Sequence, residues 1–261
     1  MTPKEVQDML VRLAWIGGML ILAGVIISAA MHKRSKDARD VLLQIEPLAS
    51  GHSLVSKQDI LLSIERSFGH TMAGIPLQEL DVERVERVLE ADPFILNADV
   101  YIDAENQVHI HLQQREPVLR IIDQNGLTYY LDELGKKMPL SEHFTARVLV
   151  ATGKIPPHVP DFQNRKRHVL KDLFALSKRI RSDAFLQPMI EQIDIDKTKD
   201  FTLVPKLGKQ KIILGDLTQL EDKIDRLKTF YNEGLSRTGW DRYRLINLKY
   251  NGQVVCTKRA I

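Results

Sequence analysis

Cysteine is almost absent from this chain, since Cys256 is the only one among 261 residues. A single cysteine excludes an intramolecular disulfide and every metal site built on cysteine pairs, so stability has to come from packing. An excess of charge of one sign is also missing, because 37 Lys and Arg nearly balance 34 Asp and Glu for a formal net charge of +3. This balance does not favour a nucleic acid as the main partner.

Signatures of the common enzyme sites are lacking as well. The sequence contains no G-x-S-x-G, H-E-x-x-H, Walker A or glycine-rich dinucleotide motif. Asp194 and Asp196 recur on one predicted strand, but no partner base accompanies them. We therefore expect no catalytic residues, no cofactor, no metal and no small-molecule substrate. A hydrolase with a nonstandard site is the alternative, and it would require a deep pocket where titratable groups converge.

One long uncharged segment is present near the N-terminus. Leu13 to Met31 is a run of nineteen residues without a charge, which is long enough to cross a bilayer core of about 30 Å as a helix. A cleaved signal peptide is the alternative, with Ser28-Ala29-Ala30 as the cleavage site, but its apolar core is usually shorter. We expect an uncleaved transmembrane helix. The cations that follow it, such as Lys33 and Arg34, leave the orientation open, because the positive-inside rule weakens when a long domain is translocated.

A polar linker, residues 32–40, precedes a segment with the pattern β-α-α-β-β. Val41 to Pro47 is predicted as a strand, and Ser56 with Asp59 as the capping box of a first helix that ends at Gly69. Asp81 is predicted to cap a second helix. Two strands with alternating apolar residues follow, around Ala98–Ile102 and Val108–Leu112.

From Arg115 onward the sequence predicts a second, mixed α/β domain. Asn125-Gly126 between two apolar runs indicates an antiparallel hairpin. A long helix is expected from about Asn164 to Ser182, and a later amphipathic helix carries Leu220, Ile224 and Leu227 on one face. A second Asn-Gly hairpin, with strands Arg244–Tyr250 and Gln253–Lys258 around Asn251-Gly252, is expected to close the chain. If its last strand lies at the sheet edge, the unpaired backbone groups offer a docking edge.

Three further groups of residues have both a functional and a structural interpretation. His109 and His111 point to one face of a strand, as a metal pair would, yet no third ligand is near and a solvated face is favoured. The basic run Asn164–His168 could contact nucleic acid or anionic lipid, but it lies on a predicted amphipathic helix without interleaved aromatic residues, so a solvated face is favoured. Arg115-Glu116-Pro117 is interpreted as a domain junction whose charged pair sets the angle between the modules, with a relay of partner binding as the alternative.

Several elements together resemble the bacterial cell-division family FtsQ/DivIB, over essentially the whole chain. They are Arg115-Glu116-Pro117, Tyr129-Tyr130-Leu131-Asp132 followed by Gly135, Met138-Pro139-Leu140, Val148 to Gly153, and Leu245-Ile246-Asn247-Leu248-Lys249-Tyr250. The resemblance implies an α+β chain with five parts. These are a cytoplasmic tail (1–12), a transmembrane helix (13–31), a linker (32–40), a POTRA-like domain (41–115) and a C-terminal β domain (116–261) that ends in an antiparallel hairpin.

The resemblance also implies a function and a location. The family is a non-enzymatic scaffold of the divisome at the septum, with the bulk of the chain on the periplasmic side of the inner membrane and with FtsB and FtsL as partners. The partner contact maps onto the terminal hairpin, namely Tyr250, Asn251, Gly252, Gln253, Val254, Val255, Cys256, Thr257 and Lys258. Some relatives place an aromatic residue near the end of this hairpin, where this chain has Cys256-Thr257-Lys258. A POTRA-containing component of a translocation or envelope-assembly system is the alternative, and it would require repeated POTRA units or a barrel.

Overall fold

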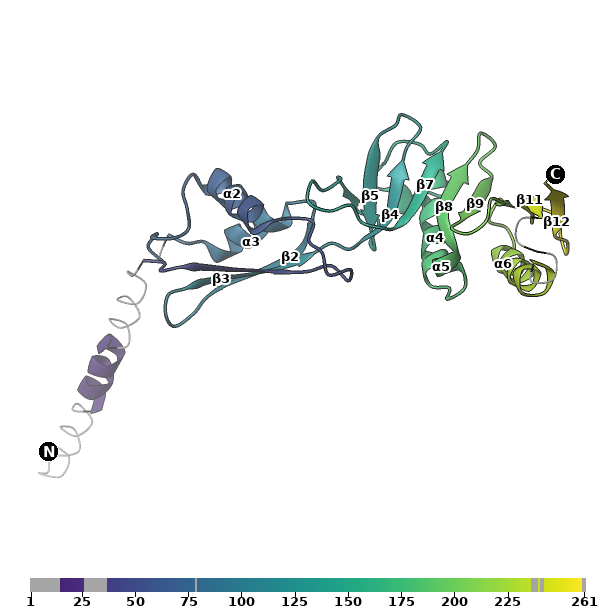
Figure 1. Cartoon of the computed structure of the whole chain (residues 1–261). Helices are drawn as coiled ribbons and strands as arrows, with labels where there is room; N and C mark the ends of the chain where they lie inside the picture. Colours follow the sequence, from purple (N-terminus) through teal and green to yellow (C-terminus); the bar gives the residue numbers. More distant parts are fainter. Residues whose placement is uncertain (1–14, 26–36, 78, 236–238, 240–241, 260–261) are drawn as a thin grey trace, which may run out of the picture. The chain divides into compact units, whose positions relative to one another are not determined.

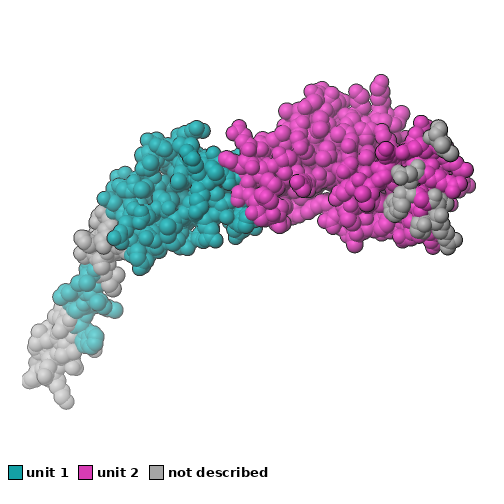
Figure 2. Space-filling view, viewed as in Figure 1, with its two compact units in different colours: residues 1–47, 55–114 teal, residues 48–54, 115–261 magenta. Residues whose placement is uncertain are grey.

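The computed structural model describes residues 15–25, 37–77, 79–235, 239 and 242–259. The chain divides into two compact units, which are coloured separately in Figure 2. The first consists of Met1–Pro47 and Val55–Gln114, and the second of Leu48–Leu54 and Arg115–Ile261. Residues 48–54 therefore belong structurally with the second unit, although the first unit surrounds them in the sequence.

The predicted membrane span lies partly outside the described residues. Within its limits, residues 15–25 are helical. Among the residues that the structure describes, no helix is both long enough and apolar enough to cross a membrane.

The first unit is a three-stranded sheet with two helices on one face (Figure 1). The strand order is β1-β3-β2, with β1 parallel and β2 antiparallel to β3. Ile60 and Ile64 from the first helix and Val85 and Leu89 from the second are buried in its core. The elements are β1 (Val41–Glu46), α2 (Lys57–Phe68), α3 (Val82–Glu90), β2 (Ile95–Ile102) and β3 (Val108–Gln114). The predicted β-α-α-β-β order is confirmed.

Local hydrogen bonds explain where these helices begin and end. The Ser56 side chain accepts from the Asp59 amide while the Asp59 carboxylate accepts from the Ser56 amide, so the predicted capping box is formed. Gly69 ends α2 with φ of 78°, a left-handed conformation that favours glycine. Asp81 accepts from the Arg84 amide at the start of α3.

The second unit is built on a nine-stranded mixed sheet. The strand order is β12-β11-β10-β9-β8-β7-β4-β5-β6, in which the pairs β4–β7, β7–β8 and β10–β11 are parallel. Its strands are β4 (Pro117–Ile122), β5 (Thr128–Asp132), β6 (Lys137–Met138), β7 (Leu149–Gly153), β8 (Ile190–Ile195), β9 (Phe201–Pro205), β10 (Lys211–Gly215), β11 (Tyr243–Asn247) and β12 (Val255–Lys258). The predicted hairpin at Asn125-Gly126 is confirmed as the antiparallel pair β4–β5.

Helices supply the other side of this core. Leu170, Leu173 and Ile180 of the longest helix and Ile224 and Leu227 of a later one are buried with the sheet residues. The helical segments are η1 (Phe162–Asn164), α4 (Val169–Arg181), α5 (Leu186–Met189), α6 (Leu220–Thr229) and η2 (Phe230–Leu235).

The start of α4 differs from the sequence prediction, which placed it at about Asn164. Residues 162–164 form a short 3₁₀ turn, and Arg165 after it is extended. The ring of His168 accepts a hydrogen bond from the Leu170 amide at 3.2 Å and so caps the helix one residue before Val169. The prediction was wrong here because the basic run Arg165–Arg167 continues the helical composition without being part of the helix.

Candidate partner-binding site

The strand β12 lies at one edge of the nine-stranded sheet, and among the residues that the structure describes it pairs with β11 alone. The Arg259 amide, just after the strand, donates to the Arg242 carbonyl at 3.0 Å. Along a β-strand, successive backbone amides point to opposite sides, so the amides of Lys258 and Cys256 face away from β11. Unpaired backbone groups of this kind can pair with another strand.

The predicted partner-binding residues divide between this strand and the loop before it. Val255, Cys256, Thr257 and Lys258 make up β12, and Val255 is 42% exposed. Cys256 is half-buried against the core, and burial raises the pKa of its thiol. The remaining five lie in the loop, of which Tyr250 is 55% exposed; they are Tyr250, Asn251, Gly252, Gln253 and Val254.

The loop is longer than the two-residue turn that Asn251-Gly252 predicted. Asn247 is paired with Val255, so residues 248–254 are outside the β11–β12 ladder. The predicted end of the first strand at Tyr250 and the predicted start of the second at Gln253 are both wrong. The cause is Arg226 of α6, whose guanidinium donates to the carbonyls of Tyr250 at 2.9 Å, Leu248 at 3.3 Å and Gln253. Three carbonyls turned toward one side chain cannot also continue a strand pair.

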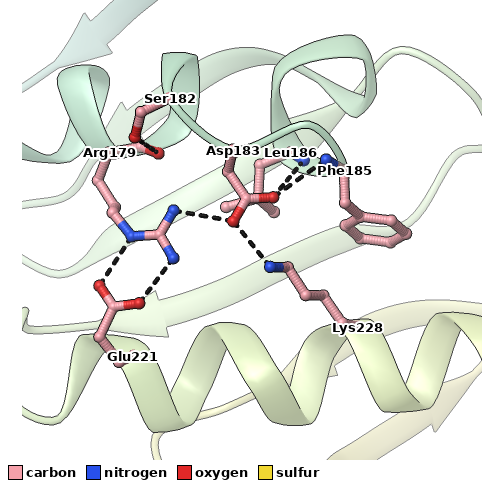
Figure 3. Close-up of polar contacts among 7 residues, drawn as sticks. All are labelled: Arg179, Ser182, Asp183, Phe185, Leu186, Glu221 and Lys228. Atoms are coloured by element: carbon pink, nitrogen blue, oxygen red, sulfur yellow. Dashed lines mark hydrogen bonds and ion pairs between the residues drawn. The ribbon is translucent and has the colours of Figure 1, made fainter.

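Arg226 lies on α6, and a polar network joins α6 to the end of α4 (Figure 3). This network fixes where α6 places the Arg226 side chain. Arg179 donates to both carboxylate oxygens of Glu221 at 2.8 and 2.6 Å and to Asp183 at 2.8 Å. Lys228 donates to the same Asp183 oxygen at 2.7 Å. One buried carboxylate therefore links cations from both helices.

The charge state of this network follows from its contacts. Burial raises the pKa of Asp183, but hydrogen bonds from Lys228, Arg179 and the amides of Leu186 and Phe185 outweigh it and hold the pKa well below its usual value. The hydrogen bond from Arg179 also lowers the pKa of Glu221. Both carboxylates are therefore ionised at neutral pH, and the network is an array of opposite charges.

The comparison with protein families matches both units. Residues 116–257 match the family described as FtsQ/DivIB, C-terminal related, and residues 37–113 match the POTRA-like domain. The first match covers more than half of the chain and extends into β12. The chain belongs to the FtsQ/DivIB family. No curated protein matches it.

Membership of FtsQ/DivIB gives the strand edge a context. The family consists of non-enzymatic scaffolds of cell division, so its domains suggest a scaffold role in cell division. Arg226 was missed from the sequence, because an arginine on an amphipathic helix resembles any solvated cation. A pointer was available in its position, one residue before the buried Leu227 and at the margin of the apolar face.

The junction residues of this FtsQ/DivIB chain are arranged differently from the prediction. Arg115 does not pair with Glu116 but with Asp132, at 2.9 Å, and both partners are buried. Glu116 accepts from the Ala49 amide at 3.2 Å, and Pro117 begins β4. The predicted charged pair was wrong because Asp132, fifteen residues beyond Pro117, lies opposite Pro117 in the β4–β5 ladder.

The histidine pair has local partners. His109 Nε2 lies 2.7 Å from an Asp103 carboxylate oxygen, and the Tyr101 ring stacks on both His109 and His111. The His109 hydrogen bond lowers the pKa of Asp103. Within the described ranges, no group of three or more His, Cys, Asp or Glu side chains could hold a metal ion.

Replacing Arg226 by alanine is expected to loosen the loop of residues 248–254 by about 1–2 kcal/mol, because three carbonyls lose a charged donor. Hydrogen exchange of the loop amides measures this change. Arg244→Ala is the matched control, since Arg244 is an exposed arginine of β11 for which the structure shows no ion pair among the described residues. Equal exchange in both variants would show that Arg226 does not shape the loop.

Proposed function

We propose that this chain is a non-enzymatic scaffold of the bacterial divisome that recruits FtsB- and FtsL-like membrane proteins by strand pairing on β12. The observation that carries the proposal is the free edge of β12 within a region that matches the FtsQ/DivIB C-terminal family. A strand added to this edge gains main-chain hydrogen bonds, and side chains next to it supply specificity.

The side chains around the edge suit an added strand with apolar contacts. Val255 and Tyr250 are large, exposed and apolar in most of their surface. Lys258, also exposed, has a second interpretation, since lysine on an edge strand protects it against pairing with copies of itself. These roles are compatible, because a charge that hinders self-association still permits a partner strand of opposite charge.

Proline in place of Lys258 is expected to weaken partner binding about tenfold. The Lys258 amide faces the free side of β12, so proline removes a donor that a partner strand would use and leaves the bond of Arg259 to Arg242 in place. One lost hydrogen bond is worth about 0.5–1.5 kcal/mol, and the upper end of this range corresponds to a factor of about ten in affinity. The measurement is the titration of the purified full chain with the FtsB- and FtsL-like proteins of the same organism.

Lys258→Ala is the control, because it removes the same side chain and keeps the amide. Binding that falls equally in Lys258→Ala and Lys258→Pro would assign the contact to the side chain. Unchanged binding in both, together with unchanged binding of a folded chain that ends at Tyr250, would place the partner site elsewhere.

The proposed function requires the two units to lie outside the cytoplasm. A helix over Leu13–Met31 would anchor the chain in the cytoplasmic membrane, with residues 32–261 in the periplasm near the septum. Protease added to spheroplasts should then digest the two units while the membrane remains closed. Complete protection of both units until the membrane is opened would overturn this topology.

A further inference from the structure

A cleft of about 480 Å³ lies in the second unit where three parallel strands end. Gln124 follows β4, Lys154 follows β7 and Asp196 follows β8, and the start of α4 supplies another part of the wall. β4 connects to β5 on one side, whereas β7 connects through α4 to β8 on the other. In open α/β sheets, ligands commonly bind in a crevice outside the carboxyl ends of parallel strands, and β4, β7 and β8 are parallel neighbours here.

The lining of this cleft is strongly cationic. Four lining side chains carry a fixed positive charge, and the structure shows no ion pair for any of them among the described residues; they are Lys154, Arg167, Lys197 and Lys199. The single acidic lining residue, Asp196, accepts from the Thr198 amide and hydroxyl and from the Asp200 amide at 2.6–3.0 Å. The Asp196 carboxylate is therefore held by hydrogen bonds within its own turn. One negative charge against four positive charges leaves the lining with a net positive charge.

His168 adds a neutral donor to the same wall. Its Nδ1 accepts the hydrogen bond from the Leu170 amide, so in the uncharged ring the proton is on Nε2. Burial, and then the charge of Arg165, lowers the pKa of His168, which favours the uncharged ring at neutral pH. No partner for Nε2 appears in the part of the chain that the structure describes, so this N–H remains able to donate to a ligand.

The alternative is that these cations are solvated side chains on separate loops and bind no ligand. Against it stands their convergence, because the cations come from three segments that are far apart in sequence, around residues 154, 167 and 197–199, and face one hollow. Like charges gathered in this way repel one another unless an anion joins them. Oxygen-rich anions suit such a site, because cationic N–H groups make their strongest hydrogen bonds to carboxylate and phosphate.

We propose that this cleft binds a phosphate-bearing anion. The size of the hollow and the number of donors fit a phosphate or diphosphate group with part of the molecule that carries it. That group can come from a lipid headgroup or from a soluble phosphorylated compound, and the two sources are distinguishable by experiment.

The test uses the purified full chain in a neutral detergent at constant ionic strength. Pyrophosphate is titrated while hydrogen exchange is followed at the amides of residues 154–155 and 197–199, with sulfate and chloride as comparison anions. The expected result is protection by pyrophosphate that sulfate and chloride do not reproduce. A parallel series replaces part of the detergent by phosphatidylglycerol or by phosphatidylcholine, and protection by phosphatidylglycerol alone would assign the group to a lipid headgroup.

Two paired variants make the result specific to the cleft. Lys154→Glu with Lys197→Glu is expected to weaken pyrophosphate or phosphatidylglycerol binding tenfold or more, whereas Lys209→Glu with Lys211→Glu makes the same change of net charge on exposed residues outside the cleft and should leave it unchanged. Thermal unfolding of both paired variants at the same temperature as the unchanged chain shows that the fold is intact. Equal loss in both pairs, equal protection by chloride, or no protection by either probe would overturn the proposal.

Discussion

Replacing Arg115 by alanine is expected to destabilise the second unit by about 3–5 kcal/mol, the usual cost of removing one partner from a buried ion pair. Arg115 is 7% and Asp132 3% exposed, and their charged atoms are 2.9 Å apart. The Asp132 carboxylate also accepts from the amides of Leu134 and Lys136 at 2.9 and 2.7 Å, so it cannot turn out toward water. Its charge would remain buried without a cation.

Hydrogen exchange of the amides in β4 and β5 measures this loss for the second unit by itself, which suits a chain of two units better than a single unfolding midpoint. The control is Arg165→Ala. Arg165 forms an ion pair with Asp161 in which the side chains are 46% and 59% exposed, and such a pair is worth about 0–1 kcal/mol. A similar small effect at Arg115 would mean that water or a neighbouring group replaces the guanidinium.

Replacing Asp183 by alanine is expected to cost about 2–4 kcal/mol. The change removes the acceptor shared by Arg179 and Lys228 and leaves those two half-buried cations facing each other. It also removes the acceptor of the Phe185 and Leu186 amides at the start of α5. The measurement is hydrogen exchange of α4 and α6, and Glu133→Ala, at an exposed ion pair with Arg181, is the control with an expected effect below about 1 kcal/mol.

The same carboxylate makes stability depend on pH in a defined direction. Because the pKa of Asp183 in the folded chain is below its value in the unfolded chain, its contribution is complete above the unfolded value of about 3.9 and is lost as the pH falls below it. Asp183→Asn should therefore flatten the loss of stability below about pH 4. If the free energy of unfolding of Asp183→Asn falls below pH 4 as steeply as that of the unchanged chain, other carboxylates cause the pH dependence.

Much of the fold could be predicted from sequence because its signals are local. Ser56 and Asp59 are three residues apart, and Asn125-Gly126 sits between two apolar runs, so neither depends on distant contacts. The terminal hairpin shows the limit of such signals. Asn251-Gly252 has the same local preference as Asn125-Gly126, but Arg226, 24 residues earlier than Tyr250, binds the loop carbonyls and opens the turn.

The candidate site could be predicted only in part from the sequence. The sequence predicted a strand at Gln253–Lys258, two residues longer than β12 at its start, and only the sheet order shows that β12 is at an edge. The contacts of Arg226 and of the network around Asp183 could not be found from periodicity. The position of Arg226 at the margin of an apolar face does not show which distant carbonyls it binds. The cleft at Lys154 depends on parallel neighbours, which one sequence does not reveal.

The grouping of residues 48–54 with the second unit limits how this chain can be divided. Within that unit the His52 ring stacks on Phe144 with centroids 4.2 Å apart, and Ala49 donates to Glu116. A fragment that starts at Arg115 would lack this segment and leave Phe144 without its stacking partner. To exchange the second unit between relatives, residues 48–54 would have to be transferred together with residues 115–261. A single cut at residue 115 would leave residues 48–54 from one protein against the second unit of another.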